Sequence, residues 1–340
     1  MDGWLAEVKD GVEARLREIL AEDRARLVAI APEAAELMEG VESLTLRGGK
    51  RLRPAVLYAA YRAVRPEAGV GDVVDAGAAL ELLQSYLLIH DDWMDGDEER
   101  RGGPSVHALL RDRHGDARLG ASLAILAGNL ACTLSWRRFE RATGEPGRRE
   151  AALAVVTRMH EEVLVGQQLD LRAVEDVSRM QQLKTGSYTL RGPIALGAAL
   201  AGATDAQSAA LDRFAHPLGE AFQMRDDLLG TFGDPASTGK PAGNDLRAGK
   251  RTALVAAAEA RCDEARLAPL RTVLGNPEAS DAAVGDAIAL LEASGARDAV
   301  ETRLSALLDE ARAALADAPL HEPGVTMLNE VADRLAYRRS

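Results

Sequence analysis

The chain of 340 residues is poor in the residues that build sheets and disulfide scaffolds. Aromatic residues make up 4% of it and there are two cysteines, whereas 47% of the residues are apolar. The core must come from Ala, Leu, Val and Ile. Because Ala and Leu are the best helix formers and runs of β-branched residues are scarce, we expect an all-α fold. Cys132 and Cys262 lie far apart without metal-like spacing, so we expect reduced thiols.

An excess of positive charge and a long apolar run are also missing. The chain has 41 Lys and Arg against 53 Asp and Glu, a net charge of −12, which argues against nucleic acid as a partner. The N-terminus lacks a signal-peptide pattern, and the best apolar stretch, 192–203, is too short for a membrane span. We therefore expect a cytoplasmic protein without a membrane span.

Apolar residues at helical spacing continue through the chain without a dividing linker, so we expect a single domain over residues 1–340. Helices are predicted over 4–30, 54–64, 71–94, 105–114, 117–142, 148–170, 175–201 and 205–229, with four or so more between 251 and 338. Gly186 inside the seventh of these helices predicts a kink or a close backbone approach. The long polar segment 231–250 is expected to be a functional loop.

An acidic cluster, Asp91, Asp92 and Asp95, ends an apolar helical run. Buried carboxylates are costly unless they are paired or hold a metal. On a helix, Asp91 and Asp95 share one face, and three carboxylates together suit Mg²⁺. Arg100 and Arg101 follow and suit a diphosphate. The cluster therefore predicts a Mg²⁺-diphosphate site.

A second acidic pair, Asp226-Asp227, ends another long helix and is followed by a loop with Lys and Arg. One such pair is usually a solvated helix end, but two are harder to dismiss. If the two helices face one another, their carboxylates can bracket Mg²⁺ ions bridged by a diphosphate, above apolar helix walls that hold a hydrocarbon. A basic turn, residues 46–53, precedes a helix whose N-terminus favours anions, although alone it is typical of a solvated turn.

These motifs, in this order, resemble those of the trans-isoprenyl diphosphate synthases of the polyprenyl synthetase family. They are Gly48-Gly49-Lys50-Arg51-Leu52-Arg53-Pro54, Asp91-Asp92-Trp93-Met94-Asp95 with Arg100-Arg101-Gly102, Lys184-Thr185, Gln223 with Asp226-Asp227, Gly239-Lys240 and Lys250-Arg251-Thr252. The resemblance implies an isoprenoid-synthase type bundle of long helices around a central cavity. It also implies a homodimer that condenses isopentenyl diphosphate with an allylic diphosphate.

The resemblance assigns roles to the matching residues. Those implied to bind isopentenyl diphosphate are Lys50, Arg53, Arg101 and Gln84. Those implied to neutralise the allylic diphosphate are Arg100, Lys184, Lys240 and Lys250. Those implied to hold about three Mg²⁺ ions are Asp91, Asp95 and Asp226. Asp92 and Asp227 would orient metal-bound waters or pair with basic residues, and Thr185 and Gln223 would lie beside the allylic cation. His90 is expected to be structural.

One position departs from the family pattern. Many members carry a third aspartate where this chain has Gly230. We expect Asp226 to hold its ion nevertheless, with Asp234 as a nearby carboxylate that could assist.

Product length should depend on the residues below the first motif. Tyr86 and Leu87 precede Asp91 by five and four residues, roughly 6–8 Å along a helix. By resemblance, an aromatic residue at Tyr86 fits a short product. Leu87 leaves some additional room, so geranylgeranyl diphosphate (C20) is expected, with farnesyl diphosphate (C15) or a longer chain as alternatives.

Two other functions are weighed against this one. A terpene cyclase would carry an N-x-x-x-S-x-x-x-E type second metal motif and would lack the Gly-Gly-Lys-Arg turn. A non-catalytic partner subunit usually loses aspartates from the first motif, whereas this chain keeps all three.

Overall fold

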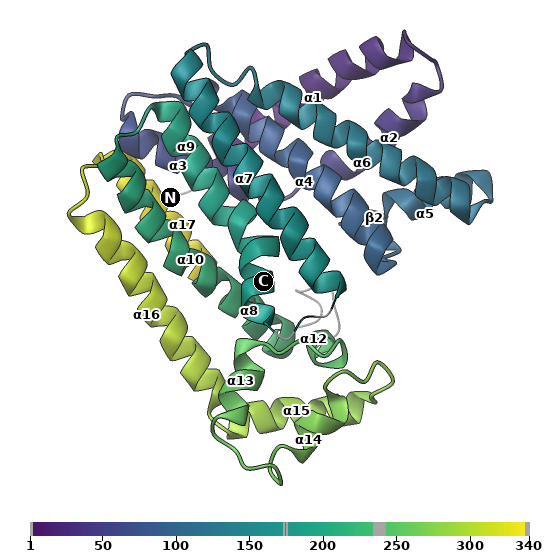
Figure 1. Ribbon diagram of the computed structural model, residues 1–340, viewed down its shortest axis with the longest axis vertical. Helices are drawn as coiled ribbons and strands as arrows, with labels where there is room; N and C mark the ends of the chain where they lie inside the picture. The colour runs from purple at the N-terminus through teal and green to yellow at the C-terminus, as the bar shows by residue number, and fades with distance from the viewer. Residues whose placement is uncertain (1–2, 173, 175, 234–242, 337–340) are drawn as a thin grey trace. The chain divides into compact units, whose positions relative to one another are not determined.

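The computed structural model describes residues 3–172, 174, 176–233 and 243–336 (Figure 1). Over these residues the chain is almost entirely helical, with one short β-hairpin, so the all-α prediction is confirmed. The chain divides into two compact units. The first contains residues 1–155 and 195–203, and the second contains residues 156–194 and 204–340. The single domain expected over residues 1–340 stays a prediction.

The first unit is built around α4, which packs most extensively against α6. Its complete elements are α1 (Gly3–Val28), α2 (Ala34–Thr45), α3 (Leu52–Val64), a 3₁₀ turn (Val70–Asp72), α4 (Val74–Asp95), β1 (Glu99–Arg100), β2 (Gly103–Pro104), α5 (Val106–His114) and α6 (Ala117–Phe139). The side chain of Asp116 caps α6 by accepting from the backbone N–H of Arg118 and Leu119. Gly96 ends α4 in the left-handed conformation, which glycine adopts without steric cost.

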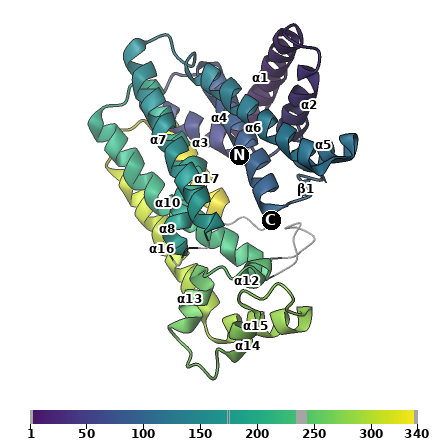
Figure 2. The ribbon, with the colours of Figure 1, turned by 45° about the vertical axis from the view of Figure 1, so that its right-hand side comes forward.

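The second unit is organised by α10, which packs along α16; both views show these two helices side by side (Figures 1 and 2). Its complete elements are α8 (Val177–Gln181), a π-helix (Gln182–Arg191), α10 (Asp205–Phe232), α12 (Asn244–Arg247), α13 (Ala253–Glu259), α14 (Ala268–Val273), α15 (Asp281–Ala293), α16 (Ala296–Ala316) and α17 (Glu322–Ala336). Two helices, α7 (Pro146–Leu171) and α9 (Gly192–Ala201), have residues in both units. Thr204 and Gln207 form a capping box at the start of α10.

Four segments differ from the sequence-based expectation. The single helix expected over 175–201 is instead α8, the π-helix and α9, and the segment expected as a loop before Pro104 contains the β1–β2 hairpin. The polar segment 231–250 contains the one-turn α12, and five helices follow residue 251 in place of about four. Gly186 was expected to mark a kink or a close backbone approach. It makes no close approach, because a Cβ there would meet its nearest atom at an ordinary 3.9 Å, but it lies in the π-helix that interrupts the expected α-helix.

Helix α6 is apolar enough, and long enough, to pass a composition test for a membrane span, although 39% of its most apolar window is buried inside the protein. Residues 192–203 were expected to be the best apolar stretch, and that expectation is wrong, because α6, predicted as a helix over 117–142, is the helix that passes this test. A single helix of this kind is weak evidence for a membrane span, because core helices of water-soluble proteins pass the same test.

Candidate active site

The first acidic cluster occupies the last turn of α4, and the hairpin that follows folds back on it. Asp92 is fully buried, and Arg100 Nε donates to its Oδ1 at 2.6 Å. Arg100 also donates to Asp97 Oδ2 at 3.0 Å. Burial raises the pKa of Asp92 to about 6, even though Arg100 acts to lower it. The contact with Arg100 agrees with the expectation that Asp92 pairs with a basic residue.

The donor set at the end of α4 fits a hard divalent cation. Asp91 and Asp95 are four residues apart in the last turn, and the C-terminal end of a helix carries partial negative charge that favours a cation. Asp92 Oδ2 is buried and has no hydrogen-bond partner among the described residues. Among these residues, no group of three His, Cys, Asp or Glu side chains already converges on one metal position.

The basic turn before α3 lies directly against the β1–β2 hairpin. Arg101 Nη1 donates to the carbonyl of Gly48 at 2.9 Å. In the other direction, Arg47 Nη1 donates to the carbonyls of Arg100 at 3.0 Å and Pro104 at 2.7 Å. A Cβ at Gly103 would lie 2.8 Å from the Arg47 guanidinium carbon, so a side chain there would make the Arg47 guanidinium shift.

The contacts between the basic turn and the β1–β2 hairpin, which we call the clamp, bring several cations together within the first unit. Burial lowers the pKa of Arg101, and the nearby charges of Arg51, Arg53 and Arg100 lower it further, against the opposite effect of Glu81. Several cations close to Arg101 favour an anionic ligand, and a diphosphate accepts hydrogen bonds from several of them at once. Lys50 is exposed on the same turn, and Gln84 is half-buried on α4.

The second acidic pair lies inside α10 rather than at its end. Asp227 is 4% exposed and accepts a hydrogen bond from Gln223 Nε2 at 3.1 Å. Burial raises the pKa of Asp227 to about 7, although Gln223 opposes the shift. Asp226 is half-buried. Gln223 and Asp227 both line a cavity of about 240 Å³ between the π-helix, α10 and α13.

Two further carboxylates hold the lysines of the second unit. Lys184 Nζ lies 2.5 Å from Asp170 Oδ2, and Lys250 Nζ lies 2.8 Å from Asp245 Oδ1. Burial alone would lower the pKa of Lys250, but Asp245 and Asp170 raise it. Lys184 also acts on Lys250, in the opposite direction, so the four side chains form one charged group. Thr185 follows Lys184 in the π-helix and is half-buried.

Comparison with known proteins gives these groups a context. The sequence pattern of the family described as Polyprenyl synthetase matches residues 34–291. The chain belongs to the polyprenyl synthetase family.

Individual members of the family are similar along most of their length. A geranylgeranyl diphosphate synthase of Mycobacterium tuberculosis is 37% identical over 84% of this chain and 80% of its own. A short chain isoprenyl diphosphate synthase of Methanocaldococcus jannaschii is 33% identical over 76% of this chain and 77% of its own. Other relatives are named farnesyl, geranylfarnesyl and nonaprenyl diphosphate synthase.

A solved structure is similar over nearly the whole chain. It is a geranylgeranyl pyrophosphate synthase of Corynebacterium glutamicum complexed with isoprenyl diphosphate and magnesium. It has a TM-score of 0.88, 33% sequence identity, and coverage of 98% of this chain and 99% of its own. The prediction that this polyprenyl synthetase is a prenyltransferase is confirmed at the level of the family.

Sequence reasoning about this polyprenyl synthetase missed three residues that contact predicted site residues within their own unit. Asp170 and Asp245 pair with the lysines, and Arg47 clamps the basic turn. Asp170 ends the segment Gly166-Gln167-Gln168-Leu169-Asp170. The glycine four residues before this carboxylate could have indicated that another segment packs closely there. Lys240 and Asp234, both predicted near the site, lie outside the described residues.

The residues predicted to set product length lie on α4 below the aspartates. Tyr86 is 8% exposed, and its ring meets His90 edge-on with 4.9 Å between ring centroids. His90 Nε2 lies 3.1 Å from the carbonyl oxygen of Ile125 on α6. A Cβ at Gly128 would be 2.3 Å from the same ring nitrogen, so His90 is enclosed between the two helices. This placement favours the structural role expected for His90. Leu87 is half-buried.

Proposed function

We propose that this polyprenyl synthetase condenses isopentenyl diphosphate with an allylic diphosphate to give geranylgeranyl diphosphate (C20), with farnesyl diphosphate (C15) or a longer chain as the alternative product. The observation that carries the proposal is the clamp in the first unit. It holds the turn with Lys50 against the hairpin with Arg100 and Arg101, beside the last turn of α4. Cations for a diphosphate and carboxylates for a metal are thus provided by one compact unit.

The carboxylates would hold Mg²⁺. Asp91 and Asp95 would bind two ions and Asp226 a third, and Asp92 and Asp227 would hold metal-bound waters or basic residues in place. When bound, Mg²⁺ neutralises the charge that builds on the leaving diphosphate. Support comes from the oxygen donors themselves and from the similar Corynebacterium glutamicum enzyme, which was solved with magnesium.

The chain's own cations would divide between the two substrates. Lys50, Arg53, Arg101 and Gln84 would bind isopentenyl diphosphate. The residues that would bind the allylic diphosphate are Arg100, Lys184, Lys240 and Lys250. Such contacts accelerate the reaction when they strengthen as negative charge moves onto the leaving group.

The reaction needs no side-chain nucleophile. The allylic C–O bond breaks and leaves an allylic cation and pyrophosphate, with Thr185 and Gln223 beside the cation. The π bond of isopentenyl diphosphate then forms the new C–C bond, and the proton lost in restoring the alkene passes to pyrophosphate.

We further propose that the protein is a homodimer through α6. Leu119 and Leu126 are 40% and 51% exposed on this helix, and large exposed apolar side chains on one helix are typical of an interface. A cytoplasmic location and the absence of a membrane span stay predictions.

The test is incubation of purified protein with isopentenyl diphosphate and dimethylallyl, geranyl or farnesyl diphosphate, with Mg²⁺ or with a chelator. We expect C20 product with Mg²⁺ and none with the chelator. We expect Asp226→Ala to lower kcat/KM by about 10²-fold. The absence of any condensation product with all three primers would overturn the proposal, and unchanged turnover of Asp226→Ala would overturn the assignment of Asp226.

A further inference from the structure

Arg51 is the one residue of the basic turn that points into the core of the first unit. It is 3% exposed, although the neighbouring Lys50 is exposed. It precedes α3 in the left-handed conformation, with φ 48° and ψ 40°. That conformation costs any residue with a Cβ free energy, and it persists where the surroundings impose it.

The surroundings that impose it are polar groups buried beneath the turn. Arg51 Nη1 forms a hydrogen-bonded ion pair with Glu81 Oε2 on α4, and Glu81 is itself 3% exposed. Arg51 Nη2 donates to the carbonyl of Thr45 at 2.9 Å, and its Nε lies 3.5 Å from Glu13 Oε1. One guanidinium therefore connects the end of α2, the start of α3, and helices α1 and α4.

A pair of hydroxyl groups forms a second connection between the end of α2 and α4. Thr45 Oγ1 and Ser85 Oγ lie 2.8 Å apart, and Ser85 Oγ donates to the carbonyl of Glu81 at 2.9 Å. The basic turn is thus fixed to α4 at Glu81, about one and a half helical turns before Tyr86 and about three turns before Asp91.

Stability alone does not explain this arrangement. A buried ion pair is often no more stabilising than apolar side chains of similar size, because both charges must leave water. Its clearer consequence is geometric, since a planar guanidinium bonded to several acceptors allows one backbone position. The backbone it fixes is the one between Lys50 and Arg53.

We propose that Arg51 is a positioning residue. Through its pair with Glu81 it fixes the turn so that Lys50 and Arg53 present their charges to the diphosphate of isopentenyl diphosphate. This rests on the proposed function of the turn, and it assigns to Arg51 and Glu81 an effect on one of the two substrates.

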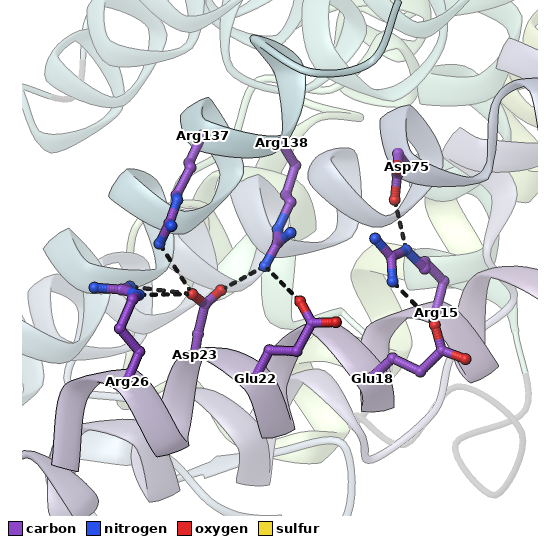
Figure 3. A network of polar contacts seen from close by, with 8 residues as sticks. All are labelled: Arg15, Glu18, Glu22, Asp23, Arg26, Asp75, Arg137 and Arg138. Carbon is purple, nitrogen blue, oxygen red and sulfur yellow. Dashed lines mark hydrogen bonds and ion pairs between the residues drawn. The ribbon is translucent and has the colours of Figure 1, made fainter. Parts of the chain in front are cut away.

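A second buried ion network in the same unit provides a matched control. Asp23 on α1 is 2% exposed and is bound by Arg26, Arg137 and Arg138, the last at 2.9 Å from its Oδ2 (Figure 3). These residues belong to helices α1 and α6 and include no part of the basic turn. Breaking this network should therefore lower stability without changing substrate affinity.

The experiment compares the double variant Arg51→Met/Glu81→Met with Asp23→Asn and with the parent protein. Removing both charges leaves neither one buried without a partner, so the double variant is expected to fold with little change in Tm. We expect its Kd and KM for isopentenyl diphosphate to rise about tenfold, the equivalent of one hydrogen bond to a charged group. The KM for the allylic substrate should stay within about twofold of the parent value. Asp23→Asn should lower Tm and leave both KM values unchanged.

Arg51→Lys is the second variant, used if the double variant does not fold. It keeps the positive charge but cannot reach Glu81 and the Thr45 carbonyl together, so we expect the same selective loss, reduced to about threefold. Equilibrium binding of isopentenyl diphosphate distinguishes a failure of the proposed function from a failure of the positioning role. If the parent protein does not bind it, the proposed function fails. If the parent binds it and the variant binds equally well, or if both substrates are weakened alike, the positioning role is wrong.

Discussion

Tyr86 is one of the two residues, with Leu87, on which the expected product length depends. It is buried on α4 five residues before Asp91, with its ring held against His90. Tyr86→Ala should open space below the aspartates, and we expect products longer than C20 by one or more five-carbon units. The same change should cost about 3–5 kcal/mol of stability, as is usual for removal of a buried ring. Product chain length and Tm are the measurements.

Tyr86→Phe is the control for this change. It keeps the ring and removes the hydroxyl, so the product profile should stay that of the parent protein. A profile that is unchanged in Tyr86→Ala as well would show that another side chain limits the product.

Gly230 stands where, by resemblance, many members of the family carry a third aspartate, and it lies close to Asp245. A Cβ built at Gly230 would lie 2.9 Å from Asp245 Oδ2, so Asp245 already occupies the space beside it. Asp245 also pairs with Lys250. We expect Gly230→Asp to displace Asp245, to lower stability by about 1–3 kcal/mol and to raise the Mg²⁺ concentration needed for half-maximal activity.

Gly285→Ala is the control in the same unit, because Gly285 lies on α15, away from the cavity, and a Cβ there meets no atom within 4 Å. It should leave the Mg²⁺ dependence unchanged and raise stability by about 0.5–1 kcal/mol. Tighter use of Mg²⁺ by Gly230→Asp would contradict the displacement of Asp245.

At the scale of helices, the π-helix and α7 meet at a glycine. A Cβ at Gly166 would lie 2.2 Å from the backbone nitrogen of Lys184, far inside any real contact. The close approach lets Asp170, four residues further along α7, pair with the Lys184 side chain. A kink or a close approach was expected at Gly186, on the π-helix itself. The close approach exists, but the glycine that allows it is Gly166 on α7, because spacing within one segment does not say which segment packs against it.

Gly166→Ala should therefore separate α7 from the π-helix and weaken the pair between Asp170 and Lys184. We expect a loss of about 1–3 kcal/mol in stability, the usual result of overpacking. We also expect a higher KM for the allylic substrate, if Lys184 binds it as proposed. Gly147→Ala, on the same helix with nothing within 4 Å of the added Cβ, should change neither quantity. Equal behaviour of the two variants in thermal unfolding and kinetics would show that the contact at Gly166 is unimportant.

At the scale of the whole molecule, an apolar helix and an acidic surface set limits on assembly. The net charge of −12 keeps copies of the chain apart in general, so association needs a specific apolar contact. Helix α6 offers one through Leu119 and Leu126. We expect Leu126→Asp to shift the protein from dimer to monomer, because the new charge would be buried without a partner. Molar mass by light scattering is the measurement.

Ile30→Asp is the control for this change. Ile30 is 75% exposed and follows α1, so the same charge is added at an apolar position outside α6. Its molar mass should equal that of the parent protein. If the parent protein is itself a monomer, the proposed dimer is wrong.

The sequence by itself determined the helical class and predicted the chemistry of the proposed site. Composition favoured helices because Ala and Leu dominate, and the spacing of Asp91 and Asp95 placed two carboxylates on one face before any coordinates were known. Such signals are local, since they depend on residues within a few positions of one another. The long helices predicted over 4–30 and 205–229 correspond to α1 and α10 for the same reason.

Tertiary structure decided which groups meet across long sequence separations. Arg51 and Glu81 are 30 residues apart, Arg47 and Pro104 are 57 apart, and nothing in the spacing of either pair predicts their contact. The pairing depends on how α2, α3 and α4 pack, and packing follows from the shape and burial of many side chains together. Sequence therefore identified Lys50, Arg53 and Arg101 as candidate ligands of an anion. Only the fold showed that Arg51 is buried against Glu81 and that Arg47 donates to the carbonyls of the hairpin, the contacts on which the proposed positioning role rests.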